Sequence, residues 1–362
     1  MKQTIALKLE TTAEQFHALL ETMEAFNAGC DDVAGFAFQK HTANKIALQP
    51  FVYAHLREAF KLSSQMAIRC ISKACEAYKR DKNLQPTFHP HGAMVYDERM
   101  MRLTDAGHVS LLTLCGRILV PMRYGAYQAA RVAMQKGQAD LILKGGVFYL
   151  YICIDMPSAP PVESKGFLGI DLGIVEIASD SEGNQYSGDA VKRVRKNVKE
   201  HRRQLQRKQT NSAKKRLRKT SARQSRFVRD VNHCISKQLV ATALRLQKAL
   251  ALEDLSGIRE RAGTVSRQMR WLLGNWSFYQ LAQFLSYKAE AVGLRVVFVD
   301  PRNTSRTCPE CGYCDKGNRK SQSCFRCLQC GFEANADFVG SRNIEARAEL
   351  SDRLLSSAAA TG

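Results

Sequence analysis

The spacing of apolar residues divides the chain into a β-rich first part and a mixed second part. Residues 1–10 alternate apolar and polar positions, which predicts a strand. A helical pattern follows, and Thr12 and Gln15 fit a capping box at its start. The predicted helices of this part cover about 12–39, 50–60 and 62–81. Short apolar runs separated by Gly and Pro over 86–155 predict further strands, so we expect a small β-barrel with the early helices inserted after its first strand.

The second part begins after the linker PSAPPVESKG at 157–166. The sequence FLGIDLGIVEIASDSEGNQYSG then predicts a strand, a tight turn, a second strand and a turn at Glu182-Gly183-Asn184. A long basic helical region is predicted over 190–249. The elements predicted after it are a strand at 249–255, a helix at about 276–292, a strand at 294–300 and a helix at about 337–348. The final residues SDRLLSSAAATG are expected to be loose.

Positive charge is the first chemical signal. Lys and Arg number 54 against 34 Asp and Glu, which gives a net charge of +20. Such a surface favours a polyanion, of which nucleic acid is the commonest and an anionic membrane the competing choice. No stretch approaches the roughly 18 consecutive apolar residues of a membrane span, and MKQTIALKLE has no signal-peptide core. We therefore expect a soluble, cytoplasmic protein that binds nucleic acid and no membrane.

The charge is concentrated in residues 191–230. This segment holds 17 Lys and Arg against Glu200 and Asp230, and it has few apolar residues. Because a merely solvated face would mix both signs, we predict that the segment contacts a nucleic-acid backbone; a bland exposed face is the alternative. The residues predicted to make these contacts are Arg202, Arg203, Lys214, Lys215, Arg216, Arg218 and Lys219.

Six of the 12 cysteines crowd into TCPECGYCDKGNRKSQSCFRCLQCG. Two C-x2-C pairs separated by 15 residues have the spacing of a zinc ribbon, and the predicted Zn²⁺ ligands are Cys308, Cys311, Cys327 and Cys330. Each pair is followed by glycine, which tolerates the sharp turn after the second thiolate. Cys314 and Cys324 form competing pairs without that glycine, and we interpret them as spare thiols. A disulfide cluster or an iron–sulfur cluster is the alternative.

Three carboxylates stand at the ends of predicted elements. Asp171 ends a strand in GIDLG, Glu253 follows an apolar run in ALEDL, and Asp337 begins the last helix in NADFVGSRNI. Clustered carboxylates can hold two Mg²⁺ or Mn²⁺ ions about 4 Å apart for phosphodiester hydrolysis. The order of strand, strand and helix is the RNase H-like pattern. Asp254 could exchange roles with Glu253, but strand alternation points the two acids to opposite faces.

Together these motifs resemble a known family. GIDLGIVEIA, LEDLSGIRER and TSRTCPECG…CLQCGFEANADFVGSRNI are similar to the three RuvC motifs and the zinc ribbon of TnpB, an accessory nuclease of bacterial insertion sequences. TnpB is related to the miniature type V CRISPR effectors. The resemblance covers about 165–347, whereas the first third resembles the family only in layout. Members often have Arg before the last acid and two alanines after it, but here Ala336 precedes Asp337 and Gly340 and Ser341 replace the alanines.

The resemblance implies an α+β fold with an RNase H-like RuvC core, an inserted zinc ribbon, and an N-terminal wedge barrel interrupted by a helical recognition lobe. The implied ranges are 1–10 and 85–156 for the wedge, 11–84 for the recognition lobe, 165–301 and 335–348 for the RuvC core, 302–334 for the zinc ribbon and 349–362 for the tail.

The resemblance also implies the function. We expect a monomeric, nucleoid-associated prokaryotic endonuclease whose guide RNA derives from the transposon end and whose single RuvC site cuts double-stranded target DNA. Base pairing would supply sequence choice, while protein contacts hold the heteroduplex. In this scheme Asp171, Glu253 and Asp337 bind the catalytic metal ions. The alternatives are a catalytically silent RNA-guided DNA-binding regulator, a DNA transposase and a CRISPR effector.

Overall fold

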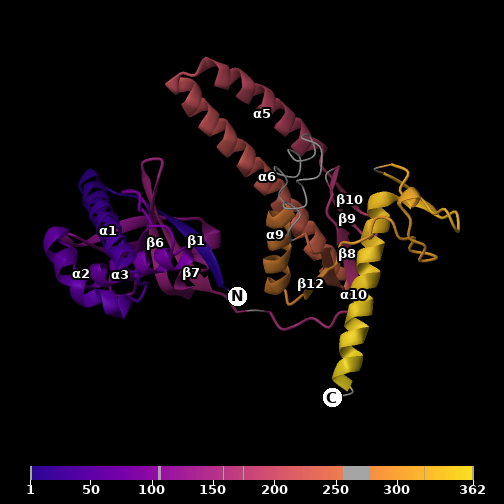
Figure 1. Cartoon of the computed structure of the whole chain (residues 1–362), viewed down its shortest axis with the longest axis horizontal. Coiled ribbons are helices and arrows are strands. Elements are labelled where there is room, and N and C mark those ends of the chain that lie inside the picture. Colours follow the sequence, from indigo (N-terminus) through magenta and orange to yellow (C-terminus); the bar gives the residue numbers. More distant parts are fainter. Residues whose placement is uncertain are drawn as a thin grey trace. The chain divides into compact units, whose positions relative to one another are not determined.

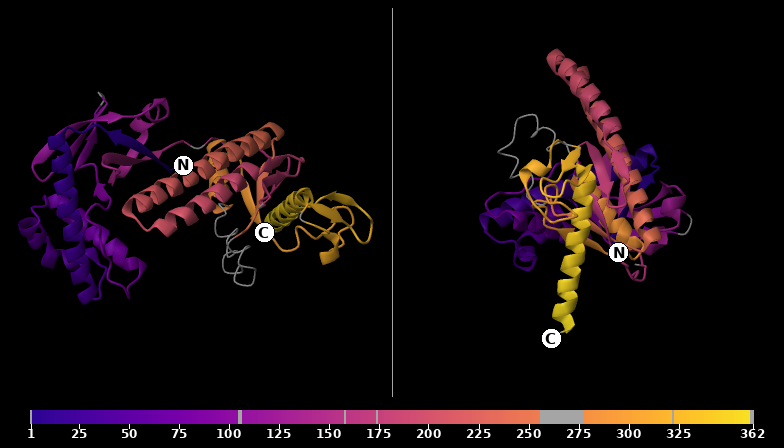
Figure 2. Two further views of the ribbon diagram at one scale, coloured as in Figure 1. Left: turned by 90° about the horizontal axis from the view of Figure 1, so that it is seen from above. Right: turned by 90° about the vertical axis from the view of Figure 1, so that its right-hand side faces the viewer.

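The computed structural model describes residues 2–104, 107–157, 159–173, 175–255, 278–321 and 323–360. The chain forms two compact units, Met1–Pro157 and Ser158–Gly362, and each is described by itself (Figures 1 and 2). None of the described helices combines the length and the apolarity that a bilayer crossing requires.

The first unit is built on a seven-stranded antiparallel sheet with the order β2-β6-β7-β1-β5-β4-β3. The N-terminal strand joins this sheet, as predicted, and lies in its middle, where it pairs with both β5 and β7. The edge strands β2 and β3 follow one another in the chain, and the sheet forms a nearly closed barrel. The strands are β1 (Lys2–Leu9), β2 (Met94–Tyr96), β3 (Met101–Leu103), β4 (His108–Thr113), β5 (Gly116–Arg123), β6 (Gln135–Lys144) and β7 (Val147–Asp155).

The helices of this unit follow β1 in the chain and share its hydrophobic core. They are α1 (Ala13–Gln39), α2 (Lys45–Ala59) and α3 (Ser64–Arg80), with the short α4 (Ala126–Ala129) and η1 (Val132–Met134) later in the chain. The capping box predicted at the start of α1 is confirmed, since Thr12 and Gln15 bond each other's backbone N–H groups. The predicted start of α2 was wrong: Asn44 accepts hydrogen bonds from two backbone N–H groups, so the helix begins at Lys45 and Pro50 lies inside it.

The second unit contains a five-stranded mixed sheet with the order β10-β9-β8-β11-β12. β8 pairs in parallel with β11, and β11 pairs in parallel with β12, whereas β9 runs antiparallel to both of its neighbours. The strands are β8 (Phe167–Asp171), β9 (Glu176–Asp180), β10 (Gln185–Ser187), β11 (Ala249–Glu253) and β12 (Val296–Val299). The turn predicted before β10 is confirmed, because Asp180 accepts hydrogen bonds from the backbone N–H groups of Glu182 and Asn184.

Helices cover both faces of this sheet (Figure 1). Leu168, Ile170, Leu250 and Leu252 pack in one cluster with residues of α6 (Asn211–Leu246) and α9 (Phe278–Ala291). The alternate positions Phe167, Ala249 and Ala251 pack in another cluster with Ile344 and Ala348 of α10 (Ala336–Ala360). Because strand side chains alternate, one face of the sheet belongs to α10 and the other to α6 and α9.

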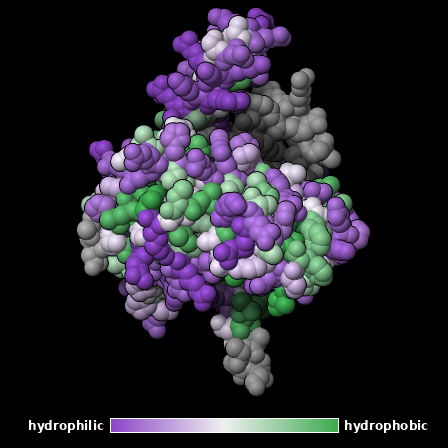
Figure 3. Space-filling view, turned by 90° about the vertical axis from the view of Figure 1, so that its left-hand side faces the viewer, coloured by the Kyte–Doolittle hydropathy of each residue, from purple (hydrophilic) through white to green (hydrophobic). Residues whose placement is uncertain are grey.

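The predicted basic helical region is confirmed. It is a hairpin of α5 (Asp189–Lys208) and α6, because Gln209 adopts a left-handed φ of 49° and Thr210 caps α6. One expectation about a helix needs correction. Residues 351–360 of the final segment are not loose: α10 continues to Ala360, since no Gly or Pro interrupts it there and Asp352 pairs with Arg295 at 2.7 Å. The cysteine-rich segment before α10 holds η3 (Lys316–Asn318), β13 (Cys324–Arg326) and β14 (Glu333–Asn335). Hydrophilic residues cover the end of the hairpin (top of Figure 3).

Candidate functional site

Strand register brings two of the predicted acids together. Gly169 of β8 pairs with Ala251 of β11, and Ile170 pairs with Leu252. The next positions are Asp171 and Glu253, at the carboxyl ends of the two parallel strands. Alternation gives these acids the α10 face, since the positions two residues earlier lie on it. The next residue, Asp254, is exposed, as the alternation predicts.

The third acid enters from α10. Asn335 accepts hydrogen bonds from the backbone N–H groups of Asp337 (2.9 Å) and Phe338 (3.3 Å), which fixes the start of the helix. One turn later Gly340 lies against Asp171: a Cβ at position 340 would be 2.8 Å from Asp171 Oδ2. Glycine at position 340 therefore leaves room for the first acid.

Burial and crowding oppose the charged forms of the three carboxyls. Burial raises the pKa of Asp171 well above its ordinary value, and the charges of Glu253 and Asp337 raise it further. Burial likewise raises the pKa values of Glu253 and Asp337, while Arg319 opposes the shift in all three. A divalent cation among these groups would offset the repulsion, and oxygen donors are the ligands that Mg²⁺ prefers. The donor set therefore fits Mg²⁺ or Mn²⁺.

Two residues that contact the acids were not predicted from the sequence. The hydroxyl of Thr304 donates to Glu253 Oε1 at 2.5 Å, and the Arg319 guanidinium lies 3.4 Å from Asp337 Oδ1. Both belong to the segment that carries the cysteine pairs. In the sequence Arg319 is one of several basic residues near the cysteines, and nothing around it indicates a contact with Asp337.

The four predicted zinc ligands lie together. Cys308 Sγ and Cys330 Sγ are 3.6 Å apart, as are Cys311 Sγ and Cys327 Sγ. All four sulfur atoms lie within 4.8 Å of one another, the only such cluster of potential ligands in the described residues. A tetrahedral zinc ion with Zn–S bonds of about 2.3 Å separates its sulfur atoms by about 3.8 Å. The cluster therefore fits Zn²⁺ closely.

The two cysteine turns have the same backbone geometry. Gly312 and Gly331 each have φ of 75°, and their N–H groups donate to the carbonyls of Cys308 (3.0 Å) and Cys327 (3.1 Å). This left-handed conformation is the physical reason for glycine after each pair. Although burial opposes it, backbone N–H groups of the second turn lower the pKa of Cys327 to about 6, which favours the thiolate. Cys314 and Cys324 stay outside the cluster.

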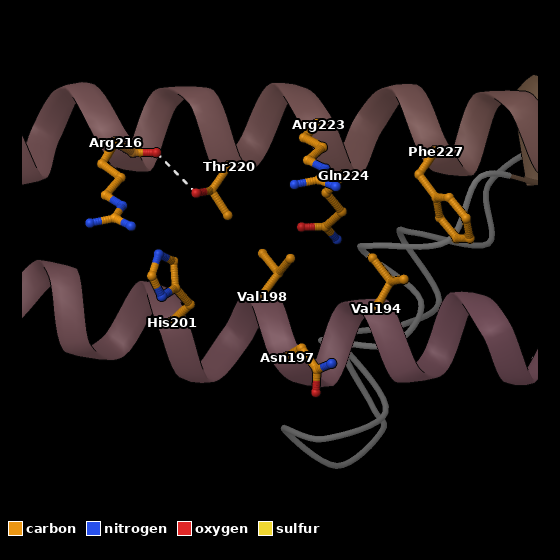
Figure 4. Close-up of a pocket in the computed structure, with 9 residues that line it drawn as sticks. All are labelled: Val194, Asn197, Val198, His201, Arg216, Thr220, Arg223, Gln224 and Phe227. Atoms are coloured by element: carbon orange, nitrogen blue, oxygen red, sulfur yellow. Dashed lines mark hydrogen bonds between the residues drawn. The ribbon is translucent and has the colours of Figure 1, made fainter.

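The predicted nucleic-acid contacts lie on the α5–α6 hairpin. All seven are exposed, and in the described part of the chain no carboxylate forms an ion pair with them. Between the two helices is a groove of about 720 Å³ (Figure 4). Val194, Val198 and Phe227 give it an apolar wall, while Arg216 and Arg223 extend toward it. The hairpin thus offers uncompensated positive charge beside apolar surface.

Comparisons with known proteins find two matching family models and several relatives. A family model described as "Probable transposase" matches residues 151–256, and one described as "Cas12f1-like, TNB domain" matches 278–344. The fold resembles the solved structure of a "Cas12f1-sgRNA-target DNA complex", with a TM-score of 0.67 at 12% identity over 95% of this chain and 98% of that one. The fold is therefore the mixed α/β fold of the Cas12f type.

Two curated relatives refine the identification. The chain is 35% identical over 157 residues to a TnpB-like protein of Methanocaldococcus jannaschii, covering 42% of this chain and 56% of that one. It is 32% identical over 215 residues to the CRISPR-associated endodeoxyribonuclease Cas12f1 of Sulfoacidibacillus thermotolerans, covering 54% of this chain and 49% of that one. The resemblance to TnpB is thereby confirmed, and the chain is a relative of TnpB-like proteins and Cas12f1. It spans about half the length of the curated relatives it matches.

Proposed function

We propose that the chain is an RNA-guided DNA endonuclease whose single RuvC-type site consists of Asp171, Glu253 and Asp337. The convergence of these acids carries the proposal. They come from β8, β11 and α10, yet register and helix packing bring them to one end of the five-stranded sheet. Nothing in the packing of an ordinary core favours three carboxylates whose charges repel one another, whereas a metal site requires them.

The three acids would bind two Mg²⁺ or Mn²⁺ ions. Such ions, when bound, activate a water molecule and stabilise the leaving oxygen of a phosphodiester. Zn²⁺ at the four cysteines would instead have a structural role, since all four positions of its tetrahedron are filled by protein ligands.

The proposed partners are a guide RNA and double-stranded target DNA. The exposed basic side chains of the hairpin support backbone contacts, which base pairing would complement with sequence choice. The names of the relatives, an endodeoxyribonuclease and a complex with guide RNA and target DNA, point the same way. Within this scheme the barrel serves as the wedge, the helices at 11–84 as the recognition lobe and the ribbon at 302–334 as an insertion in the RuvC core.

The proposal is tested by comparing DNA cleavage with DNA binding for the protein purified with its co-expressed RNA. Asp171→Ala and Glu253→Gln should abolish cutting while leaving the gel shift nearly intact, because binding depends on basic side chains and base pairing. The double variant should be no worse than either single one, since residues acting as a unit are non-additive. Asp254→Asn, the matched control at an exposed neighbouring acid, should cut like wild type.

The same assay separates the alternatives. Wild-type protein that binds guide and target without cutting would indicate a silent regulator, and products joined to a new strand would indicate a transposase. Full activity in Glu253→Gln together with an inactive Asp254→Asn would move the site to Asp254.

A further inference from the structure

The segment that leads into the cysteine cluster is attached to the proposed active site by buried side chains. Thr304 is 3% exposed and lies four residues before Cys308. Its hydroxyl has one proton and two acceptors within reach, Glu253 Oε1 at 2.5 Å and the Pro301 carbonyl at 3.1 Å. The shorter contact, to a carboxylate, is the stronger of the two. Thr304 therefore holds one oxygen of Glu253.

Asn343 in turn holds Thr304. It lies on α10, 7% exposed, and its Nδ2 donates to the carbonyl of Thr304 at 2.6 Å and to that of Thr307 at 2.8 Å. Both amide hydrogens are thus used on backbone atoms just ahead of Cys308. Because Asn343 and Asp337 belong to the same helix, this contact sets the segment relative to the third acid.

A second buried asparagine connects the two cysteine turns. Asn318 is fully buried; its Nδ2 donates to the carbonyls of Arg306 (2.9 Å) and Tyr313 (3.1 Å), and its Oδ1 accepts from the N–H of Leu328 (2.9 Å). The next residue is Arg319, which faces Asp337. The ribbon fold thus determines the backbone position of both residues that contact the acids.

We propose that Thr304 and Asn343 are positioning residues that fix the Glu253 carboxylate, so that the affinity of the three acids for a divalent ion depends on this attachment to the ribbon. The inference rests on the proposed function, because it concerns the same acids. A glutamate has three rotatable side-chain bonds, and an orienting hydrogen bond reduces the conformational freedom that would be lost on metal binding. Outer partners of ligating carboxylates typically contribute about 10- to 100-fold to metal affinity.

The test measures Mn²⁺ binding to the full chain by electron paramagnetic resonance, with zinc content and thermal unfolding recorded for each variant. Thr304→Val keeps the shape and removes the hydroxyl, so it should weaken Mn²⁺ binding by roughly 10- to 100-fold while zinc is retained. Thr304→Ser keeps the hydroxyl and should bind Mn²⁺ about as tightly as wild type. Asn343→Asp replaces the side-chain amide, which donates to the carbonyls of Thr304 and Thr307, by a carboxylate that can only accept. This variant should therefore weaken Mn²⁺ binding as Thr304→Val does.

A matched control comes from the first unit. Thr22 is fully buried, donates to the Ala18 carbonyl at 2.6 Å and accepts from the Leu114 N–H at 3.0 Å. Thr22→Val should lower the unfolding temperature without changing Mn²⁺ affinity. Wild-type Mn²⁺ affinity in Thr304→Val overturns the inference and leaves the proposed function standing. Wild-type protein that binds no Mn²⁺ overturns both.

Discussion

Gly169 is the position where the closeness of α10 to β8 can be tested most directly. A Cβ at this position would lie 2.0 Å from the carbonyl oxygen of Ser341 and 2.7 Å from the backbone N of Glu345. The first distance is about 1.4 Å short of the 3.4 Å at which ordinary contacts begin. Both atoms belong to the backbone of α10, so no side-chain rotation relieves the clash. The helix must move away from the strand, or the strand must distort.

The loss of folding free energy in Gly169→Ala follows from how far this distance falls below an ordinary contact. Overpacking of a core typically costs about 1–3 kcal/mol, and a clash with helix backbone should reach the upper end of that range or exceed it. For a unit of this size, about 3 kcal/mol lowers the unfolding temperature by roughly 6–12 °C. A shift of α10 by about 1 Å also moves Asp337 relative to Asp171, and such a misplacement can reduce cutting by about 100-fold.

The assay pairs thermal unfolding with DNA cleavage, and Gly35→Ala is the control. Gly35 lies in α1, where a Cβ would meet only Gln85 Nε2 at 3.5 Å. The same chemical change there should stabilise the protein by about 0.5–1 kcal/mol, because alanine is the better helix former. A Gly169→Ala protein with wild-type unfolding temperature and wild-type cutting would refute the packing of α10 on β8.

Three further outcomes are expected. Metal analysis should find one Zn²⁺ per chain, lost in Cys308→Ser and retained in Cys314→Ser, because zinc supplies much of the folding free energy of such a module; the opposite pattern would refute the ligand set. Since the pKa of Asp171 is raised above its ordinary 3.8, protein without added Mg²⁺ should lose stability as pH rises from about 4 through the raised pKa. Asp171→Asn should therefore unfold at a higher temperature than wild type at pH 7 without Mg²⁺, and adding Mg²⁺ should reduce this difference in unfolding temperature. Equal unfolding temperatures without Mg²⁺ would contradict repulsion among the three carboxylates. Replacing four hairpin residues by Gln should weaken nucleic-acid binding for every sequence alike and flatten its salt dependence, by up to roughly one slope unit per lost phosphate contact. The four are Lys214, Lys215, Arg216 and Lys219. Changing the three lysines to Arg keeps the charge and should leave the affinity for nucleic acid and its salt dependence almost unchanged. An unchanged salt dependence in the Gln variant would mean that these side chains are only solvated and do not contact phosphates.

The sequence by itself determined the features that depend on short stretches of chain. The capping box of Thr12 and Gln15, the turn at Gly183 and the glycines after each cysteine pair are local demands on φ and ψ. Alternation along the strands already separated Glu253 from Asp254, because successive side chains point to opposite faces. The order of the acids also followed from the chain, since each stands where a predicted element ends or begins.

Local pattern was a weaker guide to where helices begin and end. Helical propensity runs on through the basic region, and only the left-handed Gln209 with the Thr210 cap divides it into two helices. The last residues lack an obvious apolar face, yet they continue α10 because nothing in them stops a helix that begins in the core.

The tertiary structure alone decided which distant residues meet. The approach of α10 to Gly169, the contact of Gly340 with Asp171 and the hydrogen bond from Thr304 to Glu253 join segments 51 or more residues apart. Such contacts depend on strand register and on how closely two backbones can pack. Neither property can be predicted from the neighbouring residues in the sequence, since both arise only when the sheet and the helix pack together.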